Sequence, residues 1–165
     1  MVEMTLVLVV GLMVATMSLT LFNSQLMSYR ILGTQNFLVS EAPQINNTLN
    51  RIIPRANFFR MYASLTDAES GNNAVISNGK VLALQFQDPS NPLIRSFGII
   101  EYDDTLNDLN YYHIDNMAQL AVSDPEWKIT TQLDNAVFFV DNGVLRIRLT
   151  GPNGEEITYS ATTLK

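Results

Sequence analysis

Residues 4–22 read MTLVLVVGLMVATMSLTLF, and this stretch limits the possible folds of the chain more than any other segment. No Asp, Glu, Lys or Arg occurs between Glu3 and Arg30. Nineteen helical residues extend over about 28 Å, close to the roughly 30 Å hydrocarbon core of a bilayer. A cleaved signal peptide is the alternative, but it requires a basic start and a shorter apolar segment. The stretch therefore predicts a membrane-spanning helix.

The polar side chains inside this predicted helix are short. The hydroxyls of Thr16, Ser18 and Thr20 can donate hydrogen bonds to carbonyls of the preceding helical turn, so they do not oppose insertion into lipid. The apolar side chains that we assign to the transmembrane helix are Met4, Leu6, Leu8, Val10, Leu12, Val14, Leu19 and Phe22.

The residues around Glu3 carry a family resemblance. The run Met1-Val2-Glu3-Met4-Thr5 places a carboxylate directly before an uncharged membrane helix, which is uncommon because a charge in the apolar layer is costly. This pattern resembles the mature N-terminus of type IV pilins and type II secretion pseudopilins, the prepilin N-terminal methylation motif, in which Phe-Thr-Leu-Ile/Val-Glu precedes an apolar helix. Val2 and Glu3 match the last two positions, and the resemblance covers roughly residues 1–30.

The family's basic leader, its cleavage-site Gly and the first two mature residues would lie before Met1. We therefore expect an earlier start codon or a trimmed chain, and an in-frame leader in the upstream DNA would support this expectation. The resemblance implies that Glu3 pairs with the N-terminal amine of a neighbouring subunit inside a filament. A buried carboxylate is costly unless it is paired, so such a pair would also set the axial register.

The resemblance also implies a function. It is that of a minor pilin or pseudopilin of the J or W kind, a structural subunit of a type IV pilus or of a protein-secreting type II pseudopilus. The resemblance to the J or W kind rests on the run 138–150, which reads as a short strand, a tight turn and an amphipathic strand. The implied location is the inner membrane, crossed once, with the globular domain outside the cytoplasm. The implied partners are membrane lipid, other pilins and the inner-membrane assembly platform. The alternative is a single-pass anchored extracytoplasmic binding domain that does not polymerise.

Helical spacing continues after the apolar stretch. We expect a transmembrane and filament-core helix over residues 1–27, a helical continuation over 28–65 and a β-rich head over 66–165. Pro43 and Pro54 should bend or end the helix, because proline lacks the N–H donor. An apolar stripe in the continuation should pack on the protein's own sheet; it consists of Ile45, Leu49, Ile52, Ile53, Ala56 and Phe59.

The rest of the chain changes to the two-residue period of strands. Asn78-Gly79 predicts a two-residue hairpin between strands at 74–77 and 80–86, because both turn positions favour positive φ. The polar residues 66–73 predict a loop. We expect an α+β fold, with the long N-terminal helix packed on an antiparallel sheet in the pilin-like manner. The further predicted strands are residues 96–102, 109–114, 128–133, 136–140, 144–150 and 156–161.

Residues 101–115 contain five carboxylates and no Lys or Arg. Carboxylate oxygens are ligands for Ca²⁺, and some pseudopilins bind calcium, so Asp103, Asp104 and Asp108 are calcium candidates. The spacing is not that of a regular calcium loop, and a solvated acidic loop explains the same residues. A calcium-dependent rise in melting temperature would separate the two interpretations.

Composition disfavours other functions. The chain has no Cys and one His, His113, so thiolate and multi-histidine metal sites lack their ligands. No phosphate-binding glycine motif and no nucleophile elbow occurs. We therefore expect no enzyme activity, no catalytic residues and no cofactor. The net charge of −6 disfavours nucleic acid as a partner. Charge is also segregated, since residues 1–60 carry a net +2 and residues 61–165 a net −8.

Overall fold

The computed structural model describes residues 2–91 and 93–163 and divides the chain into two compact units, Met1–Asn36 and Phe37–Lys165. The first unit is helix α1, Val2–Asn36. Its sequence contains no proline, so the helix runs well past the apolar stretch. The second unit combines helices with antiparallel sheets. The predicted α+β fold, with one long apolar N-terminal helix and antiparallel strands, is confirmed.

Helical structure continues into the second unit but changes its hydrogen-bond spacing. A π-helical turn, Phe37–Glu41, precedes α2, Ala42–Ile52. Pro43 lies at the start of α2, where its missing N–H is tolerated. A wider turn before such a proline lets the helix continue. Pro43 therefore does not end the helix, although the regular α-helical pattern is interrupted just before it.

The helix ends earlier than predicted. A 3₁₀ turn, Ile53–Arg55, contains Pro54 and finishes the helical segment. The chain then turns into strand β1, Phe58–Tyr62, so the expected helical continuation to residue 65 is wrong. The apolar spacing predicted a longer helix because Phe59, which lies on strand β1, also fits the helical period.

The apolar stripe of α2 packs against the sheets, as predicted. Ile45, Leu49 and Ile53 are fully buried in a core shared with both sheets. The start of α2 is held at two points: the Tyr159 hydroxyl donates to the Ala42 carbonyl at 2.6 Å, and the Thr130 hydroxyl lies 3.0 Å from the Glu41 carboxylate. Helix α2 contacts strands β6 (Trp127–Thr130) and β9 (Glu156–Ala161).

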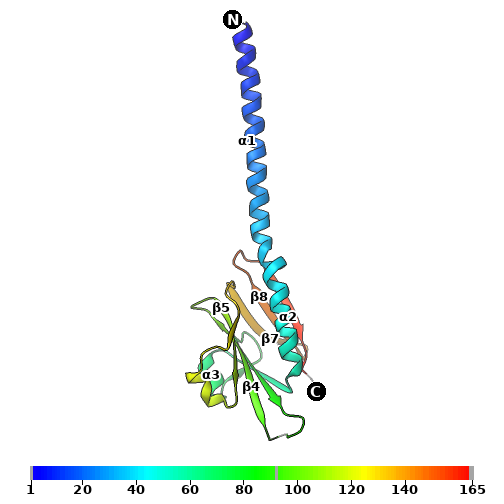
Figure 1. Cartoon of the computed structure of the whole chain (residues 1–165), viewed down its shortest axis with the longest axis vertical. Coiled ribbons are helices and arrows are strands. Elements are labelled where there is room, and N and C mark those ends of the chain that lie inside the picture. Colours follow the sequence, from blue (N-terminus) through cyan, green and yellow to red (C-terminus); the bar gives the residue numbers. More distant parts are fainter. Residues whose placement is uncertain (1, 92, 164–165) are drawn as a thin grey trace. The chain divides into compact units, whose positions relative to one another are not determined.

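Two antiparallel sheets form the head (Figure 1). The first has the strand order β2-β1-β3-β4-β5-β6, and the second has the order β7-β8-β9. The predicted strands beyond residue 95 all occur, with small shifts at their ends. The bounds are β2 Ala74–Val75, β3 Val81–Gln87, β4 Arg95–Asp103, β5 Asp108–Ile114, β6 Trp127–Thr130, β7 Asn135–Asp141, β8 Val144–Thr150 and β9 Glu156–Ala161.

The predicted hairpin at Asn78-Gly79 is wrong. Strands β2 and β3 do not pair with each other; both pair with β1, which lies between them. Gly79 instead exchanges two backbone hydrogen bonds with Phe138 on β7, at 2.9 and 2.8 Å. A Cβ on Gly79 would lie 3.1 Å from the Cβ of Met61, so glycine permits this close bridge between the two sheets.

The first sheet is covered on both faces. On β5, Leu109 and Tyr111 belong to the core under α2, whereas Tyr112 and Ile114 belong to a second core. The second core includes Ala68 of α3 (Leu65–Ser70) and Leu120 of a 3₁₀ helix, η3 (Met117–Val122). The expected loop at 66–73 is thus partly helical.

Candidate functional site

The predicted membrane segment is exposed along α1. Every described side chain of the transmembrane set is exposed, from Val10 at 51% to Met4 at 79%, and the side chain of Leu6 lies outside the described part. A soluble helix normally has a polar stripe for water and an apolar stripe for its core. This helix has apolar side chains on all sides and is long and apolar enough to span a membrane.

The hydroxyls of Thr16, Ser18 and Thr20 in α1 are bonded within the helix, as predicted. Thr16 donates to the Leu12 carbonyl at 3.0 Å and Ser18 to the Val14 carbonyl at 2.8 Å. Thr20 donates to the Thr16 carbonyl at 2.5 Å. Groups that are bonded in this way do not require water. This part of the helix therefore presents no unsatisfied hydroxyl to an apolar environment.

Glu3 is exposed in the first turn of α1. A carboxylate near a helix N-terminus interacts favourably with the unpaired N–H groups there. Among the described residues no Lys or Arg forms an ion pair with Glu3. The carboxylate is thus open to a partner from outside the chain, and its assembly role stays a prediction.

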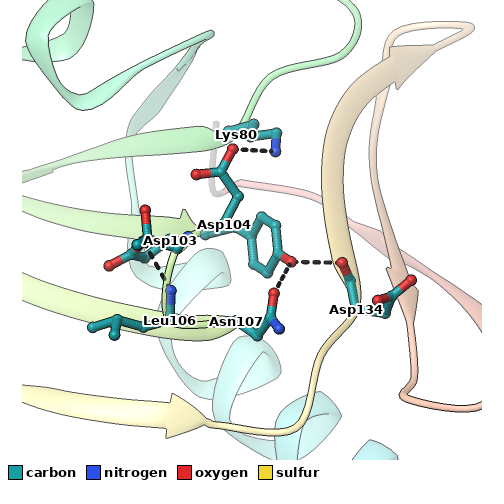
Figure 2. Close-up of polar contacts among 8 residues, drawn as sticks. Lys80, Asp103, Asp104, Leu106, Asn107 and Asp134 are labelled. Atoms are coloured by element: carbon teal, nitrogen blue, oxygen red, sulfur yellow. Dashed lines mark hydrogen bonds and ion pairs between the residues drawn. The ribbon is translucent and has the colours of Figure 1, made fainter.

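Figure 2 shows that Asp103 and Asp104, at the acidic turn between β4 and β5, face different partners. Asp103 accepts hydrogen bonds from the backbone N–H groups of Thr105 at 2.8 Å and Leu106 at 3.3 Å. Asp104 pairs with Lys80 at 3.1 Å. Asp108, which is buried, pairs with Lys128 at 2.5 Å on the neighbouring strand.

The three calcium candidates therefore face three different partners. No group of three potential metal ligands occurs within residues 2–91 and 93–163. Calcium would have to compete with Lys80 and Lys128 for two of the three carboxylates. A calcium-dependent rise in melting temperature that Asp103→Ala with Asp104→Ala abolishes stays the test of this prediction.

Sequence reasoning missed a cavity in the head. It has a volume of about 550 Å³ and lies between the end of α2 and strands β3 to β6. Its lining combines aromatic rings with cationic groups, including Arg51, Arg55, Phe86, Tyr111, His113 and Trp127. These residues are separated by up to 76 positions in sequence, so no local motif identifies them.

Two aromatic side chains of this cavity stack on each other. The rings of Tyr111 and Trp127 have centroids 4.3 Å apart and an interplanar angle of 25°. Burial, with a smaller effect from the Glu126 carboxylate, raises the pKa of Tyr111 above its ordinary value. The Tyr111 hydroxyl is therefore a hydrogen-bond donor at neutral pH.

Comparisons with protein-family models, with curated proteins and with solved structures find no match to this chain.

Proposed function

We propose that this protein is a membrane-anchored minor pilin or pseudopilin that assembles through its apolar N-terminal helix. The observation that carries the proposal is α1, whose described side chains from Met4 to Tyr29 are exposed and uncharged. Water would solvate such a surface poorly, whereas lipid or a bundle of like helices would cover it. The α+β head is a folded unit that such an anchor would present outside the cytoplasm.

Glu3 would act in assembly. Moving the helix from the membrane into a bundle places this carboxylate among apolar side chains, where an unpaired charge is strongly unfavourable. The N-terminal amine of a neighbouring subunit would neutralise this carboxylate. The pair would also favour one axial position of the two subunits relative to each other. In this proposal the chain does no chemistry, and a separate ATPase supplies the energy of assembly.

Membrane insertion is tested with two double variants that add the same charge. Val10→Lys with Val14→Lys places two ammonium groups in the apolar helix. Each one costs about 2.5–3.5 kcal/mol to insert at the centre of a membrane-spanning helix. We expect this variant to be released from membranes by alkaline carbonate, whereas the original chain stays. The control, Leu93→Lys with Val122→Lys, changes head side chains that are 88% and 87% exposed and should stay membrane-bound. Release of the unchanged chain would contradict the proposal.

Assembly is tested by placing a photo-crosslinking amino acid at Val10 in the native host. We expect adducts with other chains that carry an apolar N-terminal helix. Glu3→Ala should reduce these adducts at least tenfold, while Glu156→Ala, at an exposed position of β9, should leave them unchanged. Incorporation of the Glu3→Ala protein at the original level would contradict the assembly role of Glu3.

The alternative, an anchored binding domain that never polymerises, predicts a different pattern. It would be membrane-bound in the carbonate test, but the Val10 probe would label lipid and no neighbouring helix. The two experiments together therefore distinguish an anchored subunit from an anchored monomer.

A further inference from the structure

The cavity at the end of α2 has an excess of positive charge. Arg51 and Arg55 lie four residues apart on consecutive turns, and both are exposed. Like charges at this spacing repel each other. Neither guanidinium has an ion pair, a hydrogen bond or a ring contact within the described part of the chain. No Asp or Glu is among the described residues that line the cavity, although the head as a whole is acidic.

The interior of the cavity offers an unused donor. Tyr111 is only 5% exposed, yet its hydroxyl has no hydrogen-bond partner among the residues that the structure describes. Among the described residues only Asn110 Oδ1 is a buried side-chain polar atom without a partner, so the Tyr111 hydroxyl is open to the cavity. A ligand oxygen in the cavity can accept a hydrogen bond from it.

The backbone of β4 makes room for the rings beside this hydroxyl. A Cβ on Gly98 would lie 2.8 Å from both the Phe86 ring and the Tyr111 hydroxyl. Any residue other than glycine would therefore push these groups out of position. The Phe86 ring, which forms part of the apolar wall of the cavity, depends on that space.

We propose that this cavity binds a small amphipathic acid, an apolar ring or short chain that carries a carboxylate or phosphate group. The apolar part would lie against Phe86 and Trp127, and the acidic group would face Arg51 and Arg55. Arginine binds both kinds of anion through two parallel N–H donors. A volume of about 550 Å³ lies within the range of small-molecule sites. A protein partner would need a much larger surface. The proposal is independent of membrane anchoring and assembly.

Trp127 is the only tryptophan of the chain, so its fluorescence reports directly on the cavity. The full chain in lipid nanodiscs is titrated with 4-nitrobenzoate, a quenching aromatic acid, and with the neutral isostere 4-nitrobenzamide, in phosphate-free buffer at pH 7. We expect saturable quenching by the acid and only linear, collisional quenching by the amide. Inorganic phosphate should compete weakly, because it lacks the apolar part.

Variants separate binding from folding. Arg51→Gln with Arg55→Gln should weaken binding of the acid at least tenfold, because both charged hydrogen-bond donors are lost. Arg148→Gln is the control, since its guanidinium lies over the Phe139 ring, away from the cavity lining. Gly98→Ala should also weaken binding of the acid.

Equal linear quenching by acid and amide, or an unchanged response in the double variant, would overturn the proposal. Saturable quenching by an acidic peptide but not by 4-nitrobenzoate would overturn it in favour of a protein partner.

Discussion

At the scale of single residues, Glu101 shows how burial changes a carboxyl group. It lies on β4 and accepts a 2.6 Å hydrogen bond from the Tyr112 hydroxyl on β5. Burial raises the pKa of Glu101 above its ordinary 4.5; the hydrogen bond from Tyr112 opposes this, and the nearby Asp103 adds to it. Burial and the Glu101 carboxylate together raise the pKa of Tyr112. The ionised form of Glu101 is thus less favourable in the folded state than in the unfolded state.

The pH dependence of stability follows from this shift. Below pH 4.5 the carboxyl is protonated in both states, but above it the unfolded chain releases the proton first. The contribution of Glu101 to the free energy of unfolding therefore falls as the pH rises from 4.5 through the raised pKa of the folded state. We expect Glu101→Gln, which keeps an oxygen for Tyr112, to increase the melting temperature more at pH 7 than at pH 4.

Glu156→Gln on β9 provides the control, because Glu156 is exposed. Its melting temperature should follow that of the original chain across the same range. A Glu101→Gln protein whose gain is the same at pH 4 and pH 7 would show that burial does not govern this carboxyl group.

At the scale of elements, two similar dipeptides behave differently. Asn142-Gly143 joins β7 to β8 with φ values of 50° and 79°, the positive values of a tight hairpin turn. Asn78 also has a positive φ of 56°, but Gly79 does not, and its strand neighbours pair with β1. Local turn preference therefore formed a hairpin only where the flanking strands had no better partner.

The β7–β8 turn offers a direct test of backbone strain. Gly143→Ala should lower the free energy of unfolding by about 1–2 kcal/mol, because a side chain is unfavourable in the left-handed region. Asn142→Gly removes a side chain from the same turn without that penalty and should change stability by only a few tenths of a kcal/mol. Urea unfolding of both variants measures the difference. Equal losses would indicate that the turn does not control the hairpin.

At the scale of the whole molecule, the head carries its own cores. Its buried residues come from α2, both sheets and the short helices, all within Phe37–Lys165. We therefore expect residues 37–165 alone to be soluble without detergent and to unfold in one cooperative transition. Near-ultraviolet circular dichroism should match that of the full chain in nanodiscs. A fragment that shows secondary structure but no cooperative melting would contradict this prediction.

The sequence predicted local features better than distant ones. The apolar helix, the strands from residue 95 onward and the burial of Ile45 and Leu49 follow from periodicity, which is a property of neighbouring residues. The position of β1 between β2 and β3 depends on pairing across the chain, which no short pattern specifies. The cavity was missed for the same reason, since Arg51 and Trp127 meet only after folding.

The bond from Tyr159 to the Ala42 carbonyl has a consequence for synthesis, because it joins residues 117 positions apart. A ribosome adds about 5–20 residues per second, so α2 is made several seconds before β9 can reach it. During that time the apolar stripe of α2 lacks part of its final cover. A nascent chain that ends before β9 therefore exposes apolar surface of α2 that the finished head covers.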